Sequence, residues 1–130
     1  MTEVLFQVKA GVSKAWVCRV VEKALRSEKA KKTISVLITD DRRIRKINRR
    51  FLQHDRATDV ISFSTGDIVV SAETARRVAA ERGIPFREEL SRYLVHGTLH
   101  LLGYDDKKKK DFKRMHHRQE KILVSLRGTK

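Results

Sequence analysis

The stretch FREELSRYLVHGTLHLLG, residues 86–103, combines a helical apolar pattern with two histidines that stand four residues apart. Gly103 closes the pattern, as glycine commonly does just after a helix. Residues 86–102 are therefore predicted to form a helix. On such a helix, His96 and His100 project from one face, with Cβ atoms roughly 6 Å apart. The two imidazoles are thus placed to meet one metal ion.

A third metal ligand is predicted just beyond this helix. Asp106 comes three residues after Gly103, where a left-handed turn can bring the chain back toward the histidines. Two imidazoles and one carboxylate leave one tetrahedral position of a zinc ion open for water, as in catalytic zinc sites. The sequence therefore predicts one Zn²⁺ per chain, held by His96, His100 and Asp106. A donor set of nitrogen and carboxylate oxygen also accepts nickel, cobalt or manganese.

The same spacing occurs in zinc peptidases, whose long pattern is His-Glu-x-x-His-x-x-Gly-x-x-His/Asp. The glutamate of that pattern is the general base of peptide hydrolysis, and Gly97 stands in its place here. Proteolysis is therefore disfavoured. Two histidines four apart also occur without a metal, as surface or core residues. The glycine turn and the following aspartate favour the metal interpretation over that alternative.

Outward from this helix, the chain alternates between segments of strand and helix character. Strands are expected where β-branched and apolar residues alternate or run together, and helices where apolar positions recur at helical spacing behind a capping residue. The predicted strands are residues 3–8, 33–39, 60–63 and 68–70. The predicted helices follow caps at Ser13 (ending near Ala30), Asp40 or Asp41 (ending before 53) and Ser71 (through Arg82), with 86–102 and a last helix from Asp106 or Lys107 to Leu126.

These elements predict a single domain over residues 1–130. Their order, β-α-β-α-β-β-α-α-α, predicts an α/β (α+β) fold with a mixed sheet of about four strands covered by about five helices. Phe51 is expected to face inward from the second helix, with Ile44, Ile47 and Asn48. Phe112 is expected on the inner stripe of the last helix, with Met115, Gln119, Ile122, Leu123 and Leu126.

The charge balance indicates a polyanionic partner. Thirty Lys and Arg residues against sixteen Asp and Glu give a formal net charge of +14. A compact chain tolerates such an excess most often to bind a polyanion, although a Lys-rich surface that only aids solubility is the alternative. With few aromatic residues between the basic ones, phosphate contact is favoured over base stacking. No apolar run is long enough for a membrane span, no signal peptide is evident and Cys18 is the single cysteine, so a cytoplasmic location is expected.

At this point the residues resemble a known family. The run His96-Gly97-Thr98-Leu99-His100-Leu101-Leu102-Gly103-Tyr104-Asp105 is similar to the signature of the YbeY endoribonucleases, metal-dependent bacterial proteins of ribosomal RNA maturation. Upstream, Asn48-x-x-Phe51, residues 58–63 (TDVISF) and residues 66–71 (GDIVVS) are similar to the other two blocks of that family, in the same order. The resemblance implies a zinc-dependent hydrolase that acts on single-stranded RNA, in particular ribosomal RNA, and works with the ribosome in the cytoplasm.

The sequence departs from the family pattern at three positions. The third ligand of the family is a histidine where Asp106 stands here; the carboxylate adds negative charge and would make the metal a weaker Lewis acid. An arginine that faces the cleft in the family is replaced by Leu52, and a proline by Ser64. His116 and His117 are the alternative source of a third ligand, although the last helix would carry them roughly 15 Å along its axis.

Arg49, Arg50 and Arg56 are the candidates to contact RNA phosphates in place of the lost cleft arginine. Loss of the histidine and of that arginine leaves a second function open. The favoured function is a metal-dependent, single-strand-specific endoribonuclease of ribosomal RNA processing and ribosome maturation. The alternative is a ribosome- or RNA-binding protein that is inactive or weakly active, with a structural metal or none.

Overall fold

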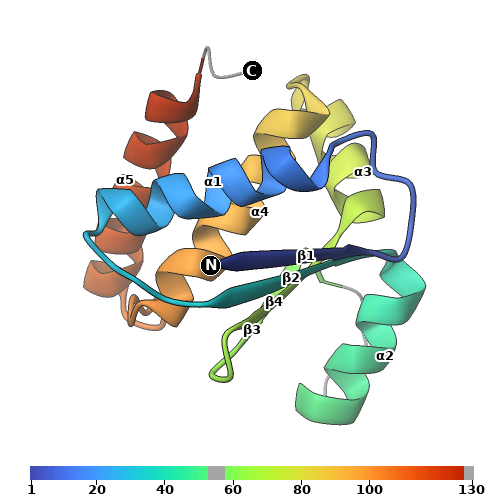
Figure 1. Ribbon diagram of the computed structural model, residues 1–130, viewed down its shortest axis with the longest axis horizontal. Helices are drawn as coiled ribbons and strands as arrows, with labels where there is room; N and C mark the ends of the chain where they lie inside the picture. Colours follow the sequence, from blue (N-terminus) through green and yellow to red (C-terminus); the bar gives the residue numbers. More distant parts are fainter. Residues whose placement is uncertain (53–57, 128–130) are drawn as a thin grey trace.

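The computed structural model describes residues 1–52 and 58–127 (Figure 1). Within those ranges the chain forms four strands and five helices, in the predicted order. In chain order they are β1 (Thr2–Phe6), α1 (Lys14–Ser27), β2 (Ile34–Thr39), α2 (Asp41–Leu52), β3 (Val60–Phe63), β4 (Asp67–Ser71), α3 (Ala72–Arg82), α4 (Phe86–Leu101) and α5 (Lys109–Leu126). The predicted fold class, a mixed sheet with covering helices, is confirmed.

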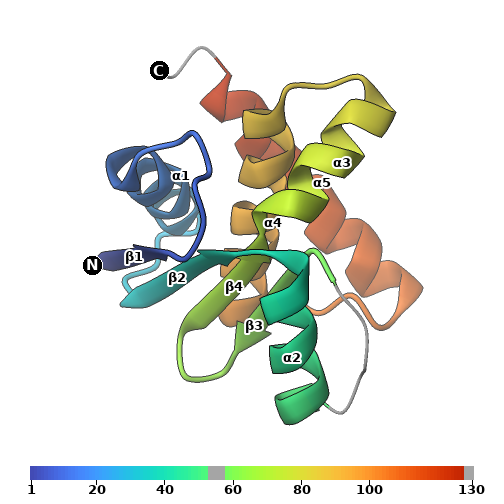
Figure 2. The ribbon, with the colours of Figure 1, turned by 90° about the vertical axis from the view of Figure 1, so that its right-hand side faces the viewer.

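The four described strands form one sheet in the order β1-β2-β4-β3. β2 pairs in parallel with β1 and with β4, and β3 pairs antiparallel to β4 as the first arm of a hairpin. The parallel pairs are joined through α1 and through the α2–β3 segment, because parallel neighbours need a crossover connection. The antiparallel β3 lies at one edge of the sheet and packs against α4 (Figure 2).

The two faces of the sheet are covered unequally. The main core lies on the face that packs against α1, α3 and α4, with α5 packed outside α4 and α1 (Figures 1 and 2). Ile34, Val36 and Ile38 of β2 point into this core, two residues apart as the pleat requires. On the opposite face α2 alone covers a small cluster of Ile44, Ile61 and Val69. The sheet therefore lies between α2 and the other four described helices.

The ends of the helices follow the capping residues of the sequence. Ser13, Asp40 and Ser71 each accept a hydrogen bond from the backbone N–H three residues on, which satisfies a donor left free in the first helical turn. Gly83 ends α3 in the left-handed conformation. Asp40 rather than Asp41 caps α2, while the Asp41 carboxylate accepts hydrogen bonds from Ser71 and Thr74. This last contact fixes the start of α2 to the start of α3.

Several predictions about the ends of elements were wrong. Phe51 is 61% exposed and Phe112 is 50% exposed, although both were expected to face the core. Each lies in a terminal turn of its helix, where helical spacing gives the direction of a side chain but not how far the neighbouring layer extends. The last helix begins at Lys109 and not at residue 106 or 107, so Asp106 lies in the connection that precedes it. None of the helices in the described ranges is both long and apolar enough to cross a membrane.

Candidate metal centre

Helix α4 lies close against the sheet at Gly97. The hydroxyl of Ser62 on β3 donates a hydrogen bond to the carbonyl oxygen of Gly97, at 3.1 Å. A Cβ atom added at residue 97 would lie 2.9 Å from Cγ2 of Ile68 on β4, closer than packed carbon atoms come. Glycine is therefore required by the packing of helix on sheet. Any side chain at this position, including the glutamate of a zinc peptidase, would press on Ile68.

The three predicted ligands meet at one point beside this contact. The Nε2 atoms of His96 and His100 lie 3.1 Å apart, and an Asp106 carboxylate oxygen lies 3.8 Å from the first and 3.4 Å from the second. The point equidistant from these three atoms is about 2.0 Å from each, which is the length of a zinc–nitrogen or zinc–oxygen bond. In the described residues, these three form the group whose donor atoms converge closely enough to hold a metal ion.

Both imidazoles present an unprotonated nitrogen to this point. Nδ1 of His96 lies 2.8 Å from Oε1 of Gln119, and Nδ1 of His100 lies 3.0 Å from the carbonyl oxygen of Tyr104. Each oxygen can only accept, so each Nδ1 carries the hydrogen and each Nε2 keeps its lone pair. Metal-binding histidines usually have such a partner on their second nitrogen. Burial lowers the pKa of His96, which keeps this imidazole neutral and able to bind a cation at neutral pH.

Asp106 reaches the histidines through the turn that closes α4. Gly103 has a φ of +99°, and its N–H donates to the carbonyl of His100 at 3.1 Å. Tyr104 is fixed next, because its N–H donates to the Leu99 carbonyl and its hydroxyl donates to Glu28 at the end of α1. The chain is thus held on both sides of the turn, and Asp106 follows two residues later, opposite the imidazoles.

The three donors line an open cleft of about 660 Å³. The lining also includes residues of α2, of the segment before β3, of β3 itself and of the turn after it. The cleft is lined by Asn48, Leu52, Thr58, Asp59, Val60, Ile61, Ser62, Ser64, His96, His100, Leu101, Gly103 and Asp106. An open cleft beside three donors leaves space for a substrate at the fourth metal position, which closed structural zinc sites lack.

The other candidate residues lie elsewhere or outside the described part. Arg49 and Arg50 are exposed on α2, whereas Asn48 and Leu52 are the α2 residues that line the cleft. Arg56 lies outside the described residues. His116 and His117 are exposed on α5 and do not join the three donors; the His116 ring stacks on that of Phe112 at 5.8 Å. The structure therefore brings Asp106, and neither of these two histidines, to the donor atoms of His96 and His100.

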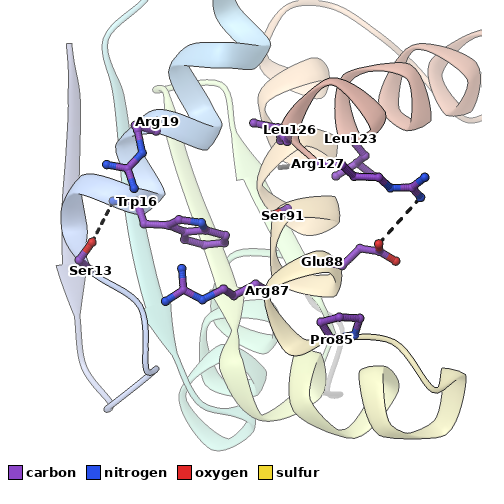
Figure 3. A pocket seen from close by; sticks show the side chains of 10 residues that line it. All are labelled: Ser13, Trp16, Arg19, Pro85, Arg87, Glu88, Ser91, Leu123, Leu126 and Arg127. Carbon is purple, nitrogen blue, oxygen red and sulfur yellow. Dashed lines mark hydrogen bonds and ion pairs between the residues drawn. The ribbon is translucent and has the colours of Figure 1, made fainter. Parts of the chain in front are cut away.

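A second hollow, of about 720 Å³, lies at the opposite end of α4 (Figure 3). Figure 3 shows Arg87 beside the indole of Trp16 and an ion pair between Arg127 and Glu88 across the hollow. Arg87 and Arg127 thus already contact an aromatic ring and a carboxylate, respectively. Because the histidines project near the far end of the helix, this hollow is separate from the metal centre.

The roles of Gln119 and Tyr104 at the centre were not predicted. Gln119 was expected as an inner residue of the last helix. A polar residue that interrupts an apolar stripe is a signal for a buried hydrogen bond, and here that bond goes to His96. Tyr104 contributes its backbone carbonyl, and a contact made by the backbone cannot be predicted from the pattern of side chains.

The fold and the centre together define a class of protein, a small α+β domain with a candidate site of two histidines and one carboxylate on a helix and its following turn. Residues 4–127 match the family described as endoribonuclease YbeY. The chain belongs to this family, and the resemblance noted in the sequence is confirmed.

Individual relatives agree with this assignment. An endoribonuclease YbeY of Persephonella marina is 36% identical, over 98% of this chain and 95% of its own. One of Syntrophotalea carbinolica is 41% identical, over 72% of this chain and 73% of its own. One of Myxococcus xanthus is 42% identical over 69% of this chain but only 35% of its own length. A solution structure of a Thermotoga maritima protein is 27% identical, with a TM-score of 0.77 over 98% of this chain and 90% of that one.

Proposed function

We propose that this protein is a metal-dependent endoribonuclease that cleaves single-stranded RNA at the cleft beside His96, His100 and Asp106. The observation that carries the proposal is the convergence of three donors on one point, with the Nδ1 atom of each imidazole facing a hydrogen-bond acceptor. The relatives named above as endoribonucleases support the choice of RNA. The net charge of +14 supports a polyanionic substrate.

The proposed cofactor is one zinc ion per chain. Zinc held by two imidazoles and a carboxylate supplies Lewis-acid chemistry, since it activates water near neutral pH and polarises a phosphoryl oxygen. The residues of the chain hold and orient this centre: Gln119 and Tyr104 fix the two histidine rings, and the turn after Gly103 fixes Asp106. Compared with a third histidine, the Asp106 carboxylate places more negative charge at the centre and moderates its Lewis acidity.

The substrate is proposed to reach the cleft along the basic surface of α2. Arg49 and Arg50 are exposed on this helix, close in sequence to the cleft residues Asn48 and Leu52. With Arg56, these arginines are the proposed contacts to RNA phosphates, whose charge dominates the affinity of proteins for nucleic acid. The proposed substrate is ribosomal RNA, and the proposed partner is the ribosome. The proposed role is ribosome maturation in the cytoplasm.

A non-catalytic RNA-binding role is the less favoured function, because the donors face an open cleft and not a closed structural site. The test is cleavage of a labelled single-stranded RNA by purified protein, before and after removal of metal by a chelator. Cleavage that is lost on chelation, returns with zinc and is absent in His96→Ala supports the proposal. Cleavage to the same products by the metal-free protein would contradict it, and salt-sensitive binding without any cleavage would favour the non-catalytic role.

A further inference from the structure

The amide of Gln119 connects the metal centre to a charged residue. This side chain is buried in α5, with its Oε1 toward Nδ1 of His96 and its Nε2 donating to Glu120 at 3.0 Å. An amide group has an acceptor at one end and a donor at the other, and a half-turn about the last bond exchanges them. The orientation of this amide therefore decides whether His96 meets an acceptor or a donor.

Glu120 is itself held in place by an arginine. Both carboxylate oxygens accept hydrogen bonds from Arg92 on α4, at 3.1 Å each, in the forked geometry that fixes a carboxylate most firmly. Arg92 also donates to Glu89 at 2.9 Å, and Arg82 reaches the same Glu89 oxygen at 2.9 Å. A continuous chain of contacts thus runs from the end of α3, through α4 and α5, to His96.

The charge state of Glu120 determines which way the Gln119 amide is oriented in this series of contacts. Burial opposes ionisation, but hydrogen bonds from Arg92 and Gln119 outweigh it and hold the pKa of Glu120 below its ordinary value. An ionised carboxylate only accepts hydrogen bonds, so the NH₂ of Gln119 must face Glu120 and its oxygen must face His96. His96 then carries its hydrogen on Nδ1.

A reversed amide would have the opposite effect. Its NH₂ group would face Nδ1 of His96, which would then have to be the acceptor, and the ring hydrogen would move to Nε2. That hydrogen would lie between two Nε2 atoms only 3.1 Å apart, in the place where the metal is expected. The reversed amide and metal binding therefore exclude each other.

We propose that Glu120, anchored by Arg92, is a positioning residue that sets the Gln119 amide and thereby the metal-binding tautomer of His96. This inference rests on the metal centre of the proposed function. The ion pair between Arg92 and Glu120 joins α4 to α5. The inference gives this ion pair a second effect, on the affinity of the centre for metal.

The test is the tautomer of His96 in the metal-free protein, read at pH 8 by long-range proton–nitrogen NMR of the imidazoles. In the wild type we expect the hydrogen on Nδ1. In Glu120→Ala we expect a substantial population with the hydrogen on Nε2, and a zinc affinity about 10-fold weaker in chelator competition, the usual size of a change in such supporting contacts. An unchanged tautomer and an unchanged zinc affinity in folded Glu120→Ala would overturn the inference.

A second pair of variants separates positioning from simple loss of stability. The double variant Gln119→Glu/Glu120→Gln places a carboxylate beside His96, which accepts in either orientation, so we expect the Nδ1–H tautomer and tight zinc binding to return. Failure of this variant to recover zinc affinity while folded would overturn the inference.

The matched control is Glu88→Gln. Glu88 lies 3.9 Å from the same arginine, outside the chain to Gln119, and its replacement should change neither readout. A tautomer shift in this control as large as that in Glu120→Ala would also overturn the inference. A wild type that binds no zinc would contradict the proposed function instead, and the NMR readout would still decide the role of Glu120.

Discussion

Nε2 of His96 and Nε2 of His100 lie 3.1 Å apart, and the hydrogen-bond partners of both rings place a lone pair on each of these atoms. Two lone pairs at this distance repel unless a cation or a proton lies between them. The adjacent Asp106 oxygen adds negative charge to the same point. A cation bound at this point would contact all three donors, and we therefore expect it to stabilise the folded protein.

Zinc is expected to stabilise the fold. A ligand that binds only the folded state at 100 times its dissociation constant raises the free energy of unfolding by about 2.7 kcal/mol. Thermal unfolding with and without zinc measures this effect, and we expect a rise in Tm of several degrees for the wild type. The variant His100→Ala should show little or no rise. An equal rise in both proteins would place the stabilising zinc somewhere else.

Gly97→Ala tests the close contact of α4 with the sheet. Alanine has the higher helix propensity and would by itself stabilise a helix by about 0.5–1 kcal/mol. The added Cβ would lie 2.9 Å from Cγ2 of Ile68, so we expect destabilisation of about 1–3 kcal/mol, measured by urea unfolding. In the background of Ile68→Ala, which removes that carbon, the penalty should shrink. A more stable Gly97→Ala protein would refute the packing explanation of this glycine.

Glu28 gives the fold a specific dependence on pH. Burial opposes ionisation of its carboxyl, but hydrogen bonds from Tyr104 and Arg118 outweigh burial and lower the pKa of Glu28. The folded state thus binds the Glu28 proton more weakly than the unfolded chain does. In the unfolded chain the pKa of a glutamate carboxyl group is about 4.3. The ionised Glu28 carboxylate therefore stabilises the folded state above about pH 4.3, and this stabilisation is lost as the pH falls through the lowered pKa of Glu28.

The variant Glu28→Gln isolates this contribution. At pH 7 we expect it to be less stable than the wild type by about 2 kcal/mol, the effect of losing charged hydrogen bonds. The difference between the two proteins should shrink as the pH is lowered below about 4. Urea unfolding of both proteins across this range measures it. A difference as large at pH 3 as at pH 7 would show that the carboxylate charge is not its source.

Leu52→Arg restores a cation to the cleft. Leu52 is 43% exposed and lines the cleft, so an arginine there can extend toward a bound phosphate. We expect single-stranded RNA to bind about 10-fold more tightly, with a salt dependence steeper by about 0.7 for one added phosphate contact. Val124 is 56% exposed on α5 and does not line the cleft, so Val124→Arg is the control for added charge alone. Equal gains in both variants would remove Leu52 from the RNA path.

Much of this fold can be predicted from the sequence because its signals are local. Capping residues such as Ser13 and Ser71, and the glycine after α3, mark helix ends through bonds made within a few residues. The histidine pair is predictable for the same reason, since both residues lie on one helix. Phe51 and Phe112 were wrongly predicted to face the core. Their exposure depends on where the neighbouring layer ends, which is a property of the tertiary structure.

The supporting contacts of the centre were beyond sequence reasoning. Gln119 meets His96 across 23 residues of chain, and Ser62 meets Gly97 across 35, so their pairing depends on how α5 and β3 pack against α4. The need for glycine at position 97 became clear only from the nearness of Ile68. The sequence showed that the peptidase glutamate is absent, and the structure shows that a side chain at this position would press on Ile68.

The central claim is that His96, His100 and Asp106 hold one metal ion, and the zinc affinity of Asp106 variants tests it most directly. The measurement is chelator competition on the wild type beside Asp106→Ala and Asp106→His. We expect one zinc per chain in the wild type, a loss of at least about 10-fold in affinity in Asp106→Ala, and zinc binding retained in Asp106→His, because imidazole is also a zinc ligand. Unchanged zinc affinity in Asp106→Ala would contradict the claim and remove this carboxylate from the metal centre.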